Sequence, residues 1–497
     1  MNILFKFSIC GFFSSLLFPP FFILPLGFIT FPYLFSLLIN EKFLKKSKIF
    51  QFGGGLIFGF TMVFFILFWI QEPFLIDEKT SNYSLVSYLL VIYCSIYFGL
   101  IFLFLGYINS NIAKLILIPI LIIISEIIRE NLFYGFPWIT FALVFSGNDF
   151  LINLIYYFGT HGLSYLVLLF FIFPAVLLLF ENNRKLLFLY ILISIGIFIV
   201  SLILILFKFY QNEEKNEIEL TISVIQLNTS QADRNKIINS EKRLKEITNI
   251  IENDLSDIII FAENEFPYIV RDLQELSFIQ QKLKNNQSLI LGAVREENAK
   301  YFNSFIFIEK NNIQEFHKMK LVPFGEFLPL RKFLFFLEPI VGNKDFTSGK
   351  KNRLIQNSNN LSVIPIICYE IIFTKILLNQ SNQNANLLIN ITNDSWFGNI
   401  SGPYQHFYLS RLRAVELNKP LIRVSNNGIS AIIDNNGKIV KHTLLNEKKI
   451  IRSNIDIFSN HKNLLKYHNL IFLFLVVFFI ISLLINNRIN ERNKKSI

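Results

Sequence analysis

Three segments of the chain carry side chains whose chemistry would combine into a covalent catalyst. These are the carboxylate of Glu263, the thiol of Cys368, and the amine of either Lys318 or Lys320. A thiol attacks only as the thiolate, and near its free pKa it is mostly protonated at neutral pH, so it needs a base. A carboxylate can act as that base, while a lysine can stabilise the thiolate and the oxyanion of a tetrahedral intermediate. The set is suited to acyl transfer in two steps through a thioester.

These residues lie far apart in the sequence, so elements of regular structure must bring them together. Residues 208–465 alternate between short β-branched segments and charged helical ones. We expect strands over 217–227, 257–264, 288–294, 301–309, 361–370 and 386–394, three short strands with turns over 420–440, and a helix over 237–254. Glu263, Cys368 and the pair Asn393-Asp394 all fall at strand ends, where catalytic groups gather in open α/β sheets.

The rest of the chain is too apolar for a soluble domain. Hydrophobic residues make up 53% of the sequence and gather in long runs over 1–207 and 470–485. A helix needs about 20 apolar residues to cross the hydrocarbon core. Eight segments satisfy this requirement: 3–19, 21–40, 53–71, 85–107, 112–130, 162–181, 186–207 and 468–486. The predicted organisation is a membrane domain of seven transmembrane helices (1–207), a water-exposed domain (208–465), and a final transmembrane helix with a basic tail (466–497).

Lysine and arginine residues in the short loops indicate how these spans are oriented. Loop 41–48 has four lysines, loop 181–186 has one arginine and one lysine, and the C-terminal tail is strongly basic. With eight spans, these segments share one side, which the positive-inside rule makes the cytoplasm. We therefore expect a multi-pass protein of a bacterial inner membrane, with both termini cytoplasmic and residues 208–465 in the periplasm. Since topology explains much of the net charge of +11, no nucleic-acid partner is expected.

The predicted topology sets Cys368 apart from the other two cysteines. Cys10 and Cys94 lie in apolar runs, whereas Cys368 is the only cysteine of the exported domain. Oxidising compartments favour paired cysteines, so a leftover one suggests a reactive thiol or an intermolecular bridge. The alternative is a buried cysteine that acts as a small hydrophobe.

Several motifs together resemble one known family. They are IIFAENEFP (259–267), FHKMKLVPFGEFLP (316–329), IPIICYEI (364–371) and NITNDSWFG (390–398), with SEIIRENLFYGFPW (125–138) and FGTHGLSYL (158–166) in the apolar half. Their order and spacing resemble the apolipoprotein N-acyltransferase family, the membrane-bound branch of the nitrilase (carbon–nitrogen hydrolase) superfamily. The resemblance implies eight membrane helices and a periplasmic αββα sandwich.

The resemblance also implies a role for each singled-out residue. Glu263 matches the general base, Lys318 rather than Lys320 matches the catalytic lysine, and Cys368 matches the nucleophile. Supporting positions are matched by Glu326 as an auxiliary acid, by Tyr369 and Glu370 beside the nucleophile, and by Asn393 and Trp396 in a loop that borders the pocket.

The reaction implied by the resemblance transfers an acyl chain from the sn-1 ester of a phospholipid to a diacylated apolipoprotein. The acceptor would be the α-amino group of an N-terminal S-diacylglyceryl-cysteine, and the enzyme would act as a monomer. No metal or other cofactor is expected, because the six histidines are scattered and none forms a ligand pair at helical spacing.

Two departures from the family pattern concern residues near the motifs. Phe261-Ala262 precedes the base where many members have Trp-Pro, and Arg234-Asn235 stands where Lys-Trp often closes an earlier stretch. The second departure bears on how the acyl chain or a lid packs. Inside the fifth span, Glu126 is expected to pair with Arg129 one helical turn away, with GFPW (135–138) as a periplasmic loop.

Other interpretations of the same residues remain open at this point. Glu263 would equally serve as a turn acid, Glu326 as the cap of a turn beside Gly325, and Trp396 as a core aromatic residue. A membrane-bound amidase that uses water as acceptor would carry the same three catalytic residues. A transporter or receptor with a ligand-binding ectodomain is the alternative from another class, and it predicts paired charges or broken helices at the bilayer midplane.

Overall fold

The chain forms two compact units, one helical and one α/β. In the computed structural model, the described residues are 2–76, 78–180, 196, 199–210, 218–230, 237–335, 338, 344–350, 353–357, 361–377 and 385–457, with single residues between 464 and 477. The helical unit comprises Met1–Phe68, Val86–Asn212 and Leu464–Ile497, and the sandwich unit comprises Trp69–Leu85 and Glu213–Asn463. The segment Trp69–Leu85 thus belongs to the α/β unit although apolar runs flank it in the sequence. The domain boundaries expected at 207 and 465 stay predictions.

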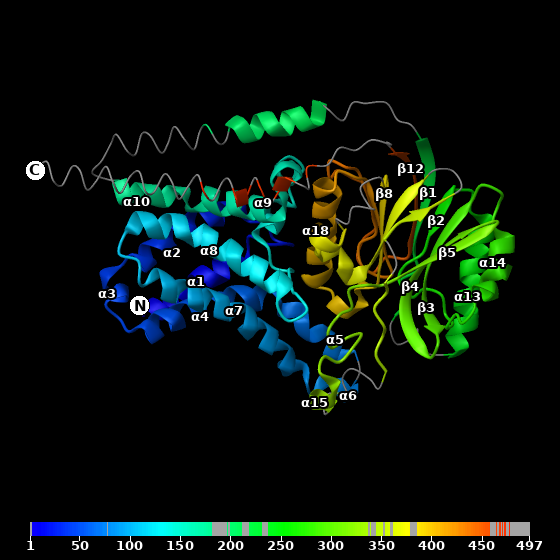
Figure 1. The fold of residues 1–497 in the computed structure, drawn as a ribbon, viewed down its shortest axis with the longest axis horizontal. Coiled ribbons are helices and arrows are strands. Elements are labelled where there is room, and N and C mark those ends of the chain that lie inside the picture. Colours follow the sequence, from blue (N-terminus) through cyan, green and yellow to red (C-terminus); the bar gives the residue numbers. More distant parts are fainter. Residues whose placement is uncertain are drawn as a thin grey trace, which may run out of the picture. The chain divides into compact units, whose positions relative to one another are not determined.

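In the part of the helical unit that the structure describes, the regular structure is helical. The helices include α1 (Ile3–Ser15), α2 (Gly27–Leu38), α3 (Glu41–Leu44), α4 (Lys48–Ile66), α7 (Tyr88–Leu105), α8 (Asn111–Asn131), α9 (Ile155–Ile172) and α10 (Val176–Phe180), as Figure 1 shows, and a further helix covers Ile199–Tyr210. Among the described residues, the helical stretches that are long and apolar enough to cross a membrane are Lys48–Ile66, Ser84–Leu105, Asn111–Asn131 and Leu151–Ala175.

These four stretches coincide with the predicted spans 53–71, 85–107, 112–130 and 162–181, although the last helix begins earlier than expected. The predicted spans 3–19 and 21–40 coincide with the shorter apolar helices Ile3–Ser15 and Leu24–Leu38. Prolines between and within these two segments account for the short lengths, since proline removes a helical hydrogen bond. The spans at 186–207 and 468–486 lie largely outside the described residues, so the count of eight stays a prediction.

The predicted pairing of Glu126 with Arg129 is wrong. Glu126 is buried in α8, and its two carboxylate oxygens accept hydrogen bonds from the Phe141 backbone N–H at 2.8 Å and the Thr140 hydroxyl at 3.0 Å. Arg129 donates instead to the backbone carbonyls of Ser125 and Ile139. The loop that follows α8 supplies both donors to Glu126 and one acceptor to Arg129, so the two side chains bind the backbone and a hydroxyl instead of each other.

Two six-stranded sheets form the sandwich unit. The first has the order β12-β1-β2-β3-β4-β5, and the second has the order β11-β10-β9-β8-β7-β6. The strands of the first sheet are β1 (Ile218–Gln226), β2 (Ile258–Ile260), β3 (Ser288–Glu297), β4 (Lys300–Glu309), β5 (Asn312–His317) and β12 (Lys449–Ile457). Those of the second are β6 (Ile355–Gln356), β7 (Ser362–Ile367), β8 (Leu387–Thr392), β9 (Leu421–Ser425), β10 (Ala431–Ile433) and β11 (Ile439–His442). In each sheet the central three strands, β1-β2-β3 and β7-β8-β9, run parallel.

Helices cover the outer faces of both sheets, which gives the four-layer αββα order. The helices α13 (Ile237–Asn253) and α14 (Ser277–Lys282) lie on the first sheet, and α18 (Gly402–Glu416) lies on the second (Figure 1). Isoleucines of both helices, Ile247, Ile251 and Ile279, pack into one core with apolar side chains of β2, β3 and β4. Strands β7, β8 and β9 are buried along their whole length, as expected for parallel strands covered on two faces.

The strands follow the sequence pattern with four differences. Strands β5, β6 and β12 were not predicted, and the strand predicted over 257–264 is confined to Ile258–Ile260. The chain leaves the sheet after Phe261, whose N–H still donates to Ile290. Glu263 therefore lies in a loop beyond the strand.

Candidate active site

Cys368 lies at a sharp turn between β7 and a 3-10 helix (η9, Cys368–Ile372). Its backbone φ is +49°, in the left-handed region that residues with a Cβ adopt only when their surroundings hold them there. The side chain is 5% exposed. The end of a buried parallel strand thus presents the thiol in a rigid and nearly closed position.

Glu263 lies in the loop after β2, with its carboxylate 4% exposed. Oε1 accepts a hydrogen bond from the Asn303 amide at 2.7 Å, and Oε2 accepts one from the Asn393 backbone N–H at 2.8 Å. Burial raises the pKa of this carboxyl, the nearby Lys318 opposes the rise, and the second carboxylate of Glu326 adds to it. A raised pKa makes the carboxylate a stronger base than an exposed one.

Lys318 follows β5 directly, and its side chain is 1% exposed. The Nζ atom lies 2.9 Å from Oε1 of Glu326 and 3.5 Å from Oε1 of Glu263. Burial by itself would lower the pKa of this amine, but the two carboxylates outweigh burial, so the pKa of Lys318 is raised. The amine is therefore an ammonium group at neutral pH.

The structure brings Glu263, Lys318 and Cys368 together. The Cys368 thiol lies close enough to the Glu263 carboxylate for the two groups to interact electrostatically. Burial and the Glu263 charge raise the pKa of the thiol, while Lys318 lowers it. In the resting state the sulfur therefore keeps its proton, and the adjacent carboxylate is placed to remove it when a substrate arrives.

Glu326 supports the lysine and also closes its own loop. Its Oε2 accepts from the Val322 backbone N–H at 2.8 Å, which is the turn-capping role considered from sequence. Its Oε1 accepts from Lys318 and from Asn303, both at 2.9 Å. Asn303 therefore donates to both carboxylates and holds them on either side of the ammonium group.

Glu370 is fully buried and ties three segments to the nucleophile's turn. Its Oε1 accepts from the backbone N–H groups of Met319 and Lys320, and both carboxylate oxygens accept from the Arg353 guanidinium at 2.7 and 2.8 Å. The Ile367 N–H also donates to it at 2.9 Å. Burial opposes the charge of Glu370, but Arg353 and these donors outweigh burial, so the pKa of the carboxyl is lowered. Glu370 thus holds the lysine's loop against the turn.

The remaining predicted residues line the edge of the site. Tyr369 is buried and packs edge-on against Phe373, and the Lys320 ammonium lies 4.8 Å from the centre of that same Phe373 ring. Lys320 therefore faces an aromatic ring, whereas Lys318 faces the carboxylates. Trp396 is 40% exposed, which excludes the core-aromatic interpretation for that residue.

Comparison with known proteins decides the family. Residues 221–458 match the carbon–nitrogen hydrolase family model, and residues 10–173 match the model of the apolipoprotein N-acyltransferase N-terminal domain. An apolipoprotein N-acyltransferase of Rickettsia bellii is 31% identical over 502 residues, covering 96% of this chain and 98% of its own. The chain belongs to the apolipoprotein N-acyltransferase family.

A second relative agrees with this assignment. The apolipoprotein N-acyltransferase of Brucella melitensis is 29% identical over 476 residues, covering 89% of this chain and 88% of its own. A solved carbon–nitrogen hydrolase superfamily protein from Xanthomonas campestris aligns with 48% of this chain and 91% of its own, with 16% identity and a TM-score of 0.38. The chain is accordingly an acyltransferase and a membrane protein with several apolar helices.

Of the two departures from the apolipoprotein N-acyltransferase pattern, one is described. Phe261 and Ala262 are fully buried, and Gly292 of the neighbouring strand leaves room for the Ala262 carbonyl, since a Cβ there would lie 2.4 Å from it. Glu263, the next residue, still contacts Asn303 and Lys318. Arg234-Asn235 lies outside the described residues.

Two residues that bind the carboxylates of the site were not predicted from the sequence, namely Asn303 and Arg353. Asn303 is a buried amide in strand β4, and Arg353 is a buried guanidinium before β6. The available signal for Asn303 was an amide at the start of the apolar half of that strand. Arg353 carried no such signal, because it follows a run of surface-type residues.

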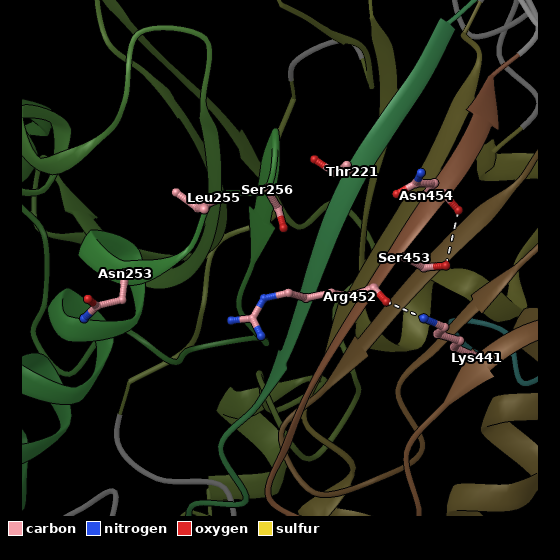
Figure 2. Close-up of a pocket in the computed structure, with 8 residues that line it drawn as sticks. All are labelled: Thr221, Asn253, Leu255, Ser256, Lys441, Arg452, Ser453 and Asn454. Carbon is pink, nitrogen blue, oxygen red and sulfur yellow. Dashed lines mark hydrogen bonds between the residues drawn. The ribbon is translucent and has the colours of Figure 1, made fainter.

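Two further features of the sandwich unit lie apart from this constellation. Ligand-type atoms of Glu297, Glu315 and His317 come together, but Arg295 already pairs with both carboxylates at 2.9 Å, so the group forms an ion-pair cluster. A hollow of about 650 Å³ is lined by Thr221, Asn253, Leu255, Ser256, Lys441, Arg452, Ser453 and Asn454 (Figure 2). It contains neither the thiol nor the carboxylates described above.

Proposed function

We propose that the chain transfers an acyl chain from the sn-1 position of a phospholipid to an apolipoprotein, through a thioester on Cys368. The acceptor is the α-amino group of an N-terminal S-diacylglyceryl-cysteine, and this is the last step of lipoprotein maturation. One observation carries the proposal. A buried thiol and a buried carboxylate of raised pKa interact with each other, and the carboxylate lies 3.5 Å from a buried ammonium group.

In the first half-reaction, Glu263 takes the proton from the Cys368 thiol as the sulfur attacks the ester carbonyl. Negative charge develops on the carbonyl oxygen, and the Lys318 ammonium stabilises it in a site from which water is excluded. The bond to the glycerol oxygen then breaks, and that oxygen takes the proton from Glu263. The products are the lysophospholipid and the Cys368 thioester.

In the second half-reaction, the neutral α-amino group attacks the thioester carbonyl. Glu263 accepts the proton that the nitrogen loses, and Lys318 again stabilises the oxyanion. The carbon–sulfur bond breaks, and the proton on Glu263 returns to Cys368. An amide forms, and the enzyme regains its starting protonation state.

Membrane attachment supports lipid substrates. Moving an acyl chain from a bilayer into water costs about 0.8 kcal/mol per CH₂. A catalytic unit connected to apolar helices avoids that loss if it works at the membrane surface. We place it on the periplasmic side of a bacterial inner membrane with both termini in the cytoplasm, and as a monomer, because all the groups named above come from one chain.

The test follows the acyl group by mass. Purified protein in lipid nanodiscs is mixed with a phosphatidylethanolamine whose sn-1 chain is isotopically labelled. We expect the labelled acyl mass on the peptide that contains Cys368, and none in C368S or E263Q. A synthetic diacylated lipopeptide should then discharge the thioester and gain the label as an amide.

Two results would overturn the proposal. One is turnover without any acyl group on Cys368. The other is discharge of the thioester by water as fast as by the lipopeptide, which would identify a membrane-bound amidase instead.

A further inference from the structure

A second buried charged network lies directly behind the nucleophile. It consists of Asp394 after β8, His406 in α18 and Arg423 in β9, and each of these side chains is fully buried. Sequence reasoning assigned no role to His406 or Arg423, and the two half-reactions described above do not use them. A buried histidine between two charged groups needs an explanation, because burying ionisable groups is unfavourable unless each is paired.

The histidine connects the network to Cys368 itself. Its Nε2 lies 3.3 Å from the backbone carbonyl oxygen of Cys368. A carbonyl oxygen only accepts hydrogen bonds, so Nε2 carries the proton in this contact. On the other side of the ring, Nδ1 lies 2.9 Å from Oδ1 of Asp394 and 3.1 Å from Nη2 of Arg423.

The ring has little freedom to move. Arg423 donates to Oδ2 of Asp394 at 2.6 Å, and its other nitrogens donate to Asn390, Ser410 and the Ile429 carbonyl. The Phe397 ring packs edge-on against the imidazole, with ring centres 5.2 Å apart. The donor that faces Cys368 is therefore fixed by α18, by β9 and by the loop after β8.

The carbonyl that His406 holds belongs to the residue with the unusual backbone. Cys368 has a φ of +49°, and a peptide group is a rigid plane in which the C=O and the next N–H point in opposite directions. A hydrogen bond to the Cys368 carbonyl thus fixes the plane that links Cys368 to Tyr369. That plane and the φ angle together fix the direction of the Cα–Cβ bond, from which the side-chain rotamer places the sulfur near Glu263.

We propose that His406 is a positioning residue, whose Nε2–H holds the Cys368 carbonyl and so keeps the sulfur within reach of its base. The consequence for acyl transfer rests on the proposed function, but the consequence for the reactivity of the thiol does not. His406 does not touch the substrate in this scheme and acts only through the backbone of the nucleophile.

Two substitutions separate the two sides of the ring. In H406Q, the amide nitrogen of glutamine can take the place of Nε2 and still donate to Cys368. In H406N, the shorter amide reaches only the place of Nδ1, so it keeps the Asp394 side and loses the Cys368 side. We expect H406Q to keep kcat within about fivefold and H406N to lower kcat about 100-fold, since misplacing a reacting group by about 1 Å costs that much. KM for the phospholipid should stay within about twofold in both variants.

A second measurement needs no acyl transfer. The full-length protein is treated with iodoacetamide without acceptor, and alkylation of the Cys368 peptide is followed by mass spectrometry. We expect the rate to fall about tenfold in H406N and to stay near that of the unaltered protein in H406Q. Thermal unfolding midpoints for both variants check that each is folded.

The alkylation experiment tests the positioning role of His406 independently of acyl transfer. Equal alkylation rates in folded H406N and H406Q would overturn it, even if the unaltered enzyme transfers acyl groups. If H406N fails to fold, the alkylation rate of folded H406Q is the test. A clearly reduced alkylation rate in H406Q would overturn the positioning role, and an unchanged rate would support it. If the unaltered chain transfers no acyl group but H406N alone slows alkylation, the proposed function fails and the positioning role stands.

Discussion

At the scale of single residues, the site depends on two carboxylates that share one ammonium group. Glu263 and Glu326 both contact Lys318, and Asn303 donates to both of them. Glu326 also accepts from the Val322 N–H of its own loop, whereas Glu263 interacts with the thiol. The two acids therefore have different roles. Glu326 is held in place by its own loop beside Lys318, and Glu263 lies beside the sulfur.

The charge of Glu326 should set the pH dependence of the reaction. Burial raises the pKa of Glu263, Lys318 opposes that rise and Glu326 adds to it. The base works only when it is deprotonated, so activity rises with pH through its pKa. Replacing Glu326 with Gln removes one cause of the raised value, so the acidic limb of the kcat/KM profile should move to lower pH. The measurement is kcat/KM against pH for E326Q and the unaltered enzyme.

A limb that stays in place, or that moves to higher pH, would contradict this assignment. E297Q is a suitable control, because Glu297 belongs to the separate ion-pair cluster with Arg295. Its acidic limb should coincide with that of the unaltered enzyme.

At the scale of elements, the carboxylate of Glu370 joins segments that are distant in the sequence. It binds Arg353, the backbone of the lysine's loop and the last residue of β7, and it is fully buried. Removing one partner of a buried ion pair leaves the other charge uncompensated, which typically costs about 3–5 kcal/mol.

Replacing Glu370 with Gln should therefore lower the thermal unfolding midpoint strongly and abolish transfer. E41Q provides the contrast, because Glu41 forms an exposed pair with Lys45, and exposed pairs contribute little to stability. Similar unfolding midpoints for E370Q and E41Q would show that the buried pair does not hold these segments together.

The segment Trp69–Leu85 packs on the loop that borders the site. Trp69 is buried, its Nε1–H donates to Gln405 at 3.0 Å, and its ring lies edge-on to Phe397 at 4.9 Å. Gly402 at the start of α18 permits this contact, because a Cβ there would lie 2.9 Å from the indole. The same Phe397 contacts His406, so the segment supports the nucleophile's surroundings from outside.

Substitution at Trp69 tests that support. W69A removes the packed ring and should destabilise the protein by about 3–5 kcal/mol, with a kcat decrease of about tenfold as the loop shifts. W69F keeps one aromatic ring in the site but loses the hydrogen bond, which is worth about 1 kcal/mol, and part of the indole's volume, so its destabilisation should be smaller than that of W69A. Thermal unfolding and acyl-transfer rates of the two variants are compared, and equal rates for both would mean that the ring does not position the loop.

Motifs and alternation were sufficient to predict most of the sandwich, and they selected Glu263, Lys318 and Cys368, which the structure brings together. They failed where contacts between residues distant in the sequence determine the strand pairing or the partner of a side chain. Strand β12 pairs with β1 from the far end of the domain, and only Ile451, Ile455 and Ile457 of its nine residues are buried, so its apolar pattern is weak. His406 lies in a helix whose polar residues are almost all buried, so spacing within α18 could not show that one of them faces Cys368. Glu126 was assigned to its helical neighbour because sequence spacing shows neighbours within a helix but not the loop that returns to it.

At the scale of the whole molecule, charge placement predicts which side of the membrane each part occupies. Loop 41–48 contains four lysines, and basic loops are retained in the cytoplasm. In a chain whose three natural cysteines are replaced by alanine, a single introduced cysteine reports on which side of the membrane its position lies. We choose Lys438, an exposed residue before β11, and Lys45, whose side chain is 78% exposed.

A membrane-impermeant maleimide should label K438C in intact cells with a permeabilised outer membrane. The reagent reacts with the thiolate, which forms in contact with water, and it does not cross the inner membrane. K45C should be labelled only after the inner membrane is lysed. Labelling of K45C in intact cells would place the basic loop outside. The catalytic residues would then face the cytoplasm, away from exported lipoproteins, and the proposed acceptor would have to be abandoned.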